Sequence, residues 1–274
     1  APAPAGAGAA KLKAAAGTLP PAVGAVLAEL ADATANQGRS AELKALSSDL
    51  KPIAEFCARA IAGRYPFASG AKADVLPEDL GQLFGQGGLM DEFFRARLQT
   101  LVDTSQSTWS YRAVDASGGR PVVTAALTEF QRAQRIREVF FRAGGKAPTL
   151  RFELRVLEID PAFKELVLDI DGQAQRLSRG GPSAVVAWPS QRLASQLRLA
   201  TNLGEQGPQL LHEGPWALFR LFDRFEVQPT AGPERFNVSM NLEGKRVRLE
   251  VISASVFNPF QLKEIKQFRC PSSL

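Results

Sequence analysis

The side chains best suited to metal binding or nucleophilic chemistry are two cysteines, Cys57 and Cys270, and one histidine, His212. A structural zinc site takes four such ligands, so these three cannot complete one. A Cys57–His212 catalytic pair is disfavoured because Cys57 falls on the apolar side of a predicted helix, whereas a reactive thiolate needs a partly exposed, electropositive site. The cysteines either form one disulfide or are two separate buried thiols, and their number allows both.

The acidic and glycine-containing stretches have simpler explanations than catalysis. The run from Asp169 to Gly172 lacks the third acidic position and the terminal glutamate of a calcium loop, and a tight hairpin turn accounts for it. Glu78 and Asp79 stand at a predicted helix start, where carboxylates interact favourably with the helix dipole. No Gly-x-Ser-x-Gly or His-Glu-x-x-His motif occurs in the sequence. We therefore expect no catalytic, cofactor-binding or metal-binding residue, and a protein that is not an enzyme.

A second class of function remains open at this point. A carbohydrate-binding or hydrolytic module could use Trp188 and Trp216 to line a cleft, together with a pair of carboxylates. Clustered carboxylates with strongly perturbed pKa values in a concave site would favour that alternative.

The composition of the 274 residues is typical of a folded protein, with 45% hydrophobic and 22% charged residues. The 33 basic and 28 acidic side chains are interspersed, so we expect no nucleic-acid partner. No run of 18 apolar residues is present, and a membrane span is expected outside this sequence. The sequence starts with Ala-Pro repeats and no methionine, and we expect it to be a fragment of a longer protein.

The first half of the sequence has helical periodicity. Residues 1–20 are rich in Ala, Pro and Gly and are predicted to be a flexible linker, and residues 21–143 a helical domain. Predicted helices follow Ser40, a plausible N-cap, and Pro52, which starts or kinks a helix. Further helices are predicted from Pro77, over residues 90–102, and around Leu127, Phe130, Ile136, Val139 and Phe140.

The periodicity changes after Gly144 and Gly145, where apolar and polar residues begin to alternate. Residues 146–274 are therefore predicted to be a β-rich domain with one inserted helix, which starts at Pro215. Asp171-Gly172 and Glu243-Gly244 are predicted hairpin turns. The fold class is α+β: an N-terminal α-helical domain followed by a C-terminal β-sandwich-like domain. The predicted strands lie in residues 150–157, 164–170, 173–178, 183–188, 192–201, 234–242 and 245–254.

Several segments, taken together and in order, resemble one family. The sequence is similar to the C-terminal periplasmic region of the IcmF/TssM proteins of bacterial type VI secretion systems. The similar segments are CARAIAGRYPF (57–67), LFGQGGLMDEFF (83–94), Trp109, FQRAQRIREVFF (130–141), DGQ (171–173), WPS (188–190), GPWALFRLFD (214–223), NPF (258–260) and QFRCP (267–271).

The resemblance implies a non-catalytic scaffold in the periplasm. Proteins of this family span the inner membrane, and their periplasmic end binds the outer-membrane lipoprotein TssJ. Together with TssL and further copies of the same protein, they build an envelope-spanning membrane complex. A periplasmic setting also favours a Cys57–Cys270 disulfide over free thiols.

The resemblance further leads us to expect the lipoprotein on the β-rich domain. Loops mounted on a rigid sheet commonly carry recognition. The candidate loops are residues 178–183, 201–208 and 228–234, because their Gly, Pro and Asn content indicates exposed turns. The candidate partner-binding residues in them are Arg179, Asn202, Gln206, Gln228 and Thr230.

Overall fold

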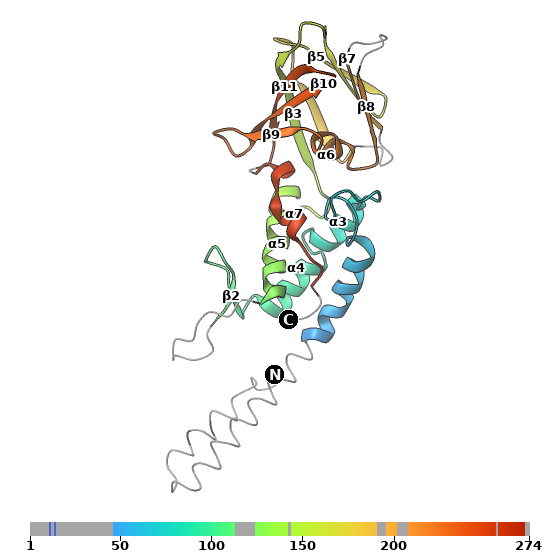
Figure 1. The fold of residues 1–274 in the computed structure, drawn as a ribbon. Coiled ribbons are helices and arrows are strands. Elements are labelled where there is room, and N and C mark those ends of the chain that lie inside the picture. Colours follow the sequence, from blue (N-terminus) through green and yellow to red (C-terminus); the bar gives the residue numbers. More distant parts are fainter. Residues whose placement is uncertain are drawn as a thin grey trace.

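The computed structural model describes residues 11, 14, 46–112, 124–141, 144–190, 196–201, 208–255 and 257–271. Helices occupy the first part of the chain and two antiparallel sheets the second (Figure 1), which confirms the predicted α+β class. We call residues 46–141 the helical region, residues 150–255 the β region and residues 257–271 the C-terminal segment. The expected linker, Asn202 and Gln206 lie in parts of the chain that are not described, apart from Lys11 and Ala14.

The helical region is built from amphipathic helices whose ends have recognisable chemical causes. α3 (Pro77–Phe84) has proline at its first turn, followed by Glu78 and Asp79, as predicted. α5 (Ala125–Phe140) begins at Thr124, whose hydroxyl accepts a hydrogen bond from the Leu127 amide at 3.2 Å. The other helices are residues 46–60 and the short α4 (Leu89–Phe93), which continues as one π-helical turn (Phe94–Leu98).

The helix boundaries in this region differ in part from those predicted. The helix over residues 46–60 is continuous across Pro52, so of the two alternatives for Pro52 a helix start is excluded. The helix predicted over 90–102 ends at Leu98, because Val102 pairs with Tyr111 in a small hairpin. That hairpin consists of β1 (Val102–Asp103) and β2 (Ser110–Tyr111). Strand pairing thus overrides the helical apolar spacing there.

The β region is a sandwich of a five-stranded and a four-stranded antiparallel sheet. The five-stranded sheet has the order β6 (Ala184–Trp188), β3 (Leu150–Ile159), β11 (Lys245–Ser253), β10 (Arg235–Leu242), β9 (Glu226–Pro229). The four-stranded sheet has the order β5 (Gln173–Leu177), β4 (Leu166–Ile170), β7 (Gln196–Thr201), β8 (Gln209–Glu213). Strands β8 and β9 were not predicted.

Both predicted hairpin turns are confirmed. Asp171 and Gly172 have φ values of 56° and 84°, and Glu243 and Gly244 have φ values of 52° and 83°. Two successive positive φ values match the right-handed twist of the flanking strands, which is why a glycine follows an acidic residue at both turns.

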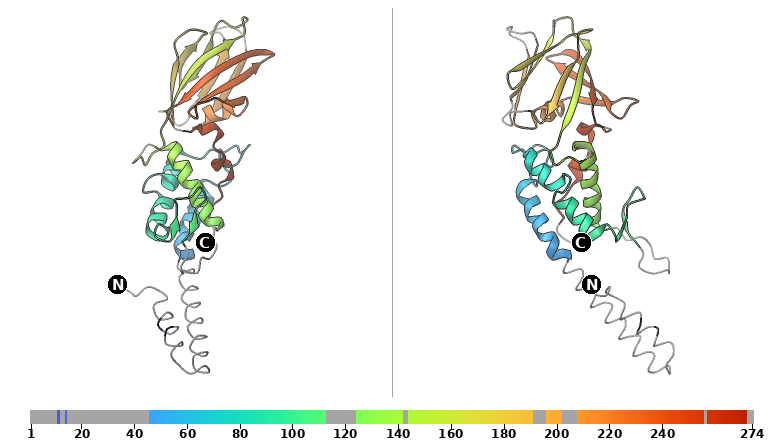
Figure 2. Two further views of the ribbon diagram at one scale, coloured as in Figure 1. Left: turned by 90° about the vertical axis from the view of Figure 1, so that its left-hand side faces the viewer. Right: turned by 180° about the vertical axis from the view of Figure 1, so that it is seen from behind.

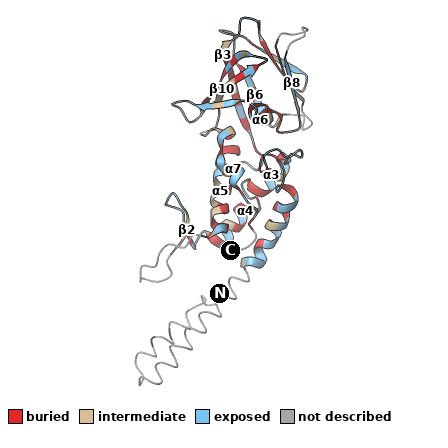
Figure 3. Cartoon of the chain, in the orientation of Figure 1, coloured by how far each residue is buried: buried red, intermediate tan, exposed pale blue. Residues whose placement is uncertain are grey.

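The β region encloses an aromatic core near the helices. Alternate residues of β3 point inward, and Phe152 is buried among Phe219 and Phe260. Phe219 belongs to α6 (Ala217–Phe222), the single helix inserted into the β region, as predicted. Figure 3 shows buried residues lining the facing surfaces of the helices and sheets. Among the described residues, no helix has the length and apolarity to cross a membrane.

The two regions are stacked end to end. Two further views (Figure 2) show the β region at one end of the helices, with the C-terminal segment running back along them. This segment contains a turn of 3₁₀ helix (Pro259–Gln261) and α7 (Lys263–Gln267), which packs against α5. Residues 263–271 therefore lie with the helical region, although the sequence assigned them to the β-rich domain.

Candidate partner-binding surface

The start of α6 joins the β region to the helical region. The indole Nε1 of Trp216 donates a hydrogen bond to the carbonyl oxygen of Val75 at 2.7 Å, and the Trp216 side chain is fully buried. Arg220 forms an ion pair with Asp74 at 2.5 Å, and its guanidinium lies 4.1 Å from the centre of the Tyr65 ring. A buried indole hydrogen bond, an ion pair and a cation–π contact thus meet at one junction.

A further hydrogen bond and a required glycine complete this junction. The Tyr65 hydroxyl donates a hydrogen bond to Asp223 Oδ2 at 2.7 Å. Burial, reinforced by this bond, raises the pKa of Tyr65 far above its usual value. Gly214 has a φ of 91°, and a Cβ atom there would lie 2.5 Å from Asp74 Oδ2. Only glycine allows the chain to pass this close to Asp74.

The C-terminal segment makes the second connection between the regions. Phe260 packs among the rings of Phe219, Phe222 and Phe236 inside the β region. Eight residues later, Phe268 lies against Phe84 in the helical core, with ring centres 5.0 Å apart. One short segment therefore places an aromatic side chain in each core.

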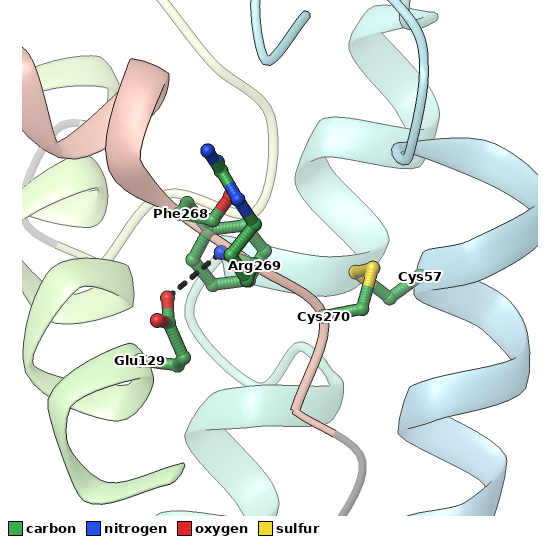
Figure 4. The surroundings of a disulfide bond; sticks show 5 residues. All are labelled: Cys57, Glu129, Phe268, Arg269 and Cys270. Carbon is green, nitrogen blue, oxygen red and sulfur yellow. Dashed lines mark hydrogen bonds between the residues drawn. A yellow bond between two sulfur atoms is a disulfide. The ribbon is translucent and has the colours of Figure 1, made fainter. Parts of the chain in front are cut away.

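A disulfide between Cys57 and Cys270 closes this connection (Figure 4). Cys57 is fully buried on the helix over residues 46–60, and Cys270 is partly buried. The amide of Arg269 donates to Glu129 Oε2 at 2.9 Å, which gives the buried Glu129 carboxylate a backbone partner. The last described residues of the chain are thus held on the helical region by covalent and polar bonds.

With both connections in place, one end of the β sandwich points away from the helices. We call this the distal end; it is where β3 finishes at Ile159. The strand registers place the end of β5 and the end of β7 there, because both Leu177 and Thr201 pair with Leu166 at the start of β4. The loop that follows β5, residues 178–183, therefore belongs to the distal end (Figure 1).

The structure separates the candidate partner-binding residues. Arg179 is exposed in the turn after β5, toward the distal end. Gln228 is in strand β9, not in a loop as predicted, because it pairs with Asn237 of β10. Thr230 lies at the opposite end of the sandwich, where its hydroxyl donates to the carbonyl oxygen of Arg235 at 3.1 Å. That bond stabilises the turn in which Thr230 itself lies.

The arrangement offers little support for the hydrolytic alternative. Trp188 and Trp216 are buried, with ring centres 4.4 Å apart, so they pack against each other and do not line an open cleft. Hydrogen bonds lower the pKa values of Asp103 and Glu153, through Ser105 and Ser183 respectively. Neither carboxyl is tuned to act as an acid near neutral pH. No group of three or more His, Cys, Asp or Glu side chains suited to a metal ion occurs in the described part of the chain.

The sequence of the β region matches a known family. Residues 152–255 match the family model of the type VI secretion protein IcmF C2-like domain. The chain is also 42% identical, over 224 residues, to the type VI secretion system component TssM1 of Pseudomonas aeruginosa (strain PAO1). This chain is a relative of the IcmF/TssM proteins. The match covers 79% of this chain and 20% of TssM1, so the chain spans about one fifth of that relative's length.

Solved structures from the same system share the fold. The TssM C-terminal domain from EAEC matches with a TM-score of 0.68 and 20% identity, over 85% of this chain and 98% of that one. A chain of a type VI secretion system membrane core complex matches with a TM-score of 0.70 and 20% identity, over 90% of this chain and 52% of that one. At these identities the likeness establishes the fold.

Sequence reasoning missed the residues that join the two regions. The sequence offered no partner for Trp216, and Asp74 and Arg220 received no role. Their partners lie about 140 positions away in the sequence, and no local pattern links positions so far apart. The one available signal was the buried tryptophan itself, since a buried indole normally needs a hydrogen-bond acceptor.

Proposed function

We propose that this chain is a non-catalytic scaffold in the periplasmic part of a type VI secretion membrane complex, and that its β region binds the outer-membrane lipoprotein TssJ. TssL and further copies of the same protein are the other partners, and the membrane span lies outside this chain. The relation to TssM1 supports the membership in such a complex.

The observation that carries the assignment to the β region is its attachment at two places. The Trp216 junction and the C-terminal segment both fix the β region on the helices. A rigidly mounted sandwich presents its distal loops at a defined position, which reduces the ordering cost of binding. The helical region then serves as the support, and its outer faces are available to neighbouring copies.

The loop over residues 178–183 is the part of the distal end on which we place the contact. Arg179 is exposed there, and the neighbouring Gly180 has a φ of 73°, a conformation that favours glycine. A standard interface buries about 800 Å² on each partner, which a few loops and an adjacent strand can supply.

Co-purification with the TssJ lipoprotein from the same gene cluster tests this proposal. The whole chain should retain the soluble, non-acylated lipoprotein, and Arg179→Glu should weaken retention. Gln228→Glu is the matched control, because Gln228 is also exposed, on β9. Equal retention by both variants would contradict the placement at residues 178–183. Failure of the unmodified chain to retain the lipoprotein would contradict the proposed function.

A further inference from the structure

The two edges of the five-stranded sheet are protected very differently. β9, at one edge, ends in Pro229, and Gln261 Nε2 donates to the carbonyl oxygen of Val227 at 2.8 Å. β6, at the other edge, has the sequence AVVAW, with no proline and no charge. Natural proteins normally protect an edge strand with such residues, because its unpaired backbone groups pair readily with another chain.

The hydrogen bonds show which backbone groups of β6 face outward. In an antiparallel pair, the N–H and C=O of one residue point to the same side, and successive residues alternate. The carbonyl oxygen of Val185 accepts a bond from Gln175 Nε2 at 3.2 Å, so Val185 faces away from β3. Ala187, two residues further, faces the same way.

Strand β3, the neighbour of β6, shows independently that the backbone groups of Ala187 face outward. Ala187 lies opposite Arg151 on β3, and the carbonyl oxygen of Arg151 accepts from the amide of Ala254 at 2.9 Å. Arg151 therefore faces β11 and not β6. Within the described residues, no hydrogen bond is found to the amide of Val185 or to the amide and carbonyl of Ala187.

A pocket lies beside this edge. It has a volume of about 570 Å³ and separates β6 from the β4–β5 hairpin. Gln175 bridges the two sides, and its side-chain amide occupies the place that a backbone amide of an added strand would take. Asp171 alone among the lining residues carries a charge, and it has no ion-pair partner in the described part of the chain. Val185 is 56% exposed at the same edge.

We propose that the free edge of β6 binds an extended segment of a partner protein, which adds a strand to the five-stranded sheet. Outward backbone donors and acceptors at strand spacing are complementary to another extended backbone. The segment displaces the Gln175 amide, pairs with Val185 and Ala187, and carries lysine or arginine opposite Asp171. The edge is continuous with the loop over residues 178–183, which leads directly into β6.

This inference rests on the proposed function, because it takes the lipoprotein as the partner that supplies the strand. Ala187→Pro tests it: proline removes the outward amide of Ala187 without removing a bond to β3. Val227→Pro is the matched control, because Val227 has the same outward position on β9. Affinity for the soluble lipoprotein is measured by calorimetry. Ala187→Pro should weaken binding about tenfold, and Val227→Pro by less than about twofold.

A second readout does not depend on how the variants fold. In the unmodified chain, hydrogen exchange at the amides of Val185 and Ala187 should slow when the lipoprotein binds. Unchanged exchange at both amides in a formed complex overturns the edge assignment and leaves the proposed function standing. A folded Ala187→Pro variant that binds the lipoprotein as tightly as the unmodified chain also overturns the edge assignment and leaves the proposed function standing. Absence of binding by the unmodified chain overturns the proposed function, and the edge assignment with it.

Discussion

The helical region and the β region satisfy their polar groups in different ways. In the helical region, the buried Asp91 carboxylate accepts from the Gly87 amide at 2.8 Å, from Arg137 at 2.6 Å and from Arg95. In the β region, ion pairs such as Glu158–Arg248 lie on the outer sheet face with both side chains about half exposed. On β6, the outward amide of Val185 and the amide and carbonyl of Ala187 have no hydrogen bond within the described residues.

This difference indicates a division of labour. The helical region holds the buried Asp91 carboxylate in internal hydrogen bonds and is tied further by the disulfide, so it is suited to support. The β region keeps backbone edges and charged loops at its surface, where a partner can use them. Changes in the helical region should therefore mainly affect stability, and changes at the distal loops and the β6 edge should mainly affect binding.

Removal of the disulfide is expected to have the largest effect. Cys57 and Cys270 are 213 positions apart, and in the chain-entropy model closing such a loop stabilises the fold by about 5 kcal/mol. The Cys57→Ala, Cys270→Ala double variant should have a clearly lower urea midpoint. Reductant should lower the midpoint of the unmodified chain to the same level and leave the variant unchanged. An equal midpoint for both proteins without reductant would contradict this.

A pair of charge-removing substitutions compares the two regions directly. Asp91→Asn should destabilise by about 3 kcal/mol, because it leaves Arg137 partly buried without its charged partner. Burial already lowers the pKa of Arg137 to about 10, which shows the cost of its desolvation. Glu158→Gln, on the exposed face of the β region, should leave the urea midpoint unchanged. Similar losses from both substitutions would remove the contrast between the regions.

The junction between the regions should show an intermediate effect. Trp216→Phe keeps the aromatic packing but leaves the carbonyl oxygen of Val75 without its 2.7 Å hydrogen bond. We expect a loss of about 1–2 kcal/mol in unfolding free energy. Hydrogen exchange should also become faster in residues 64–75, since this loop is held by Trp216. A stability loss without faster exchange there would place the role of Trp216 in the β core alone.

The smallest effect on stability is expected at the distal end. Arg179→Glu should change the unfolding free energy by less than about 0.5 kcal/mol, because Arg179 is exposed in a turn. Its affinity for the lipoprotein should nevertheless fall. The informative comparison is between the change in unfolding free energy and the change in affinity for the lipoprotein. A variant that loses stability and binding together would not support the division of labour.

Local sequence signals predicted many of the helices and strands but not the contacts between them. The alternation from Leu150 to Val156 predicted the inward face of β3, and Asp171-Gly172 predicted its hairpin, because both depend on neighbouring residues. Strands β8 and β9 were missed because each is short and lacks clear alternation. The contacts of Trp216 and Phe268 join distant parts of the chain, which no local pattern encodes.

The candidate site was predictable only in part. The turn that carries Arg179 was visible from its glycine and proline residues, whereas Gln228 was taken for a loop residue because Pro229 follows it. That proline occupies an outward position of an edge strand, where no amide is needed. The open edge of β6 had one signal in the sequence, the uncharged run SAVVAW, but the run alone does not tell an edge strand from a central one.

Hydrogen exchange of the whole chain, with and without the soluble lipoprotein, tests the central claim most directly. If the β region carries the contact and the helical region supports it, slower exchange on binding should appear within residues 150–190, including the loop over 178–183. Residues 46–141 should exchange as they do in the free chain. Protection confined to residues 46–141, with the β region unchanged, would contradict the account.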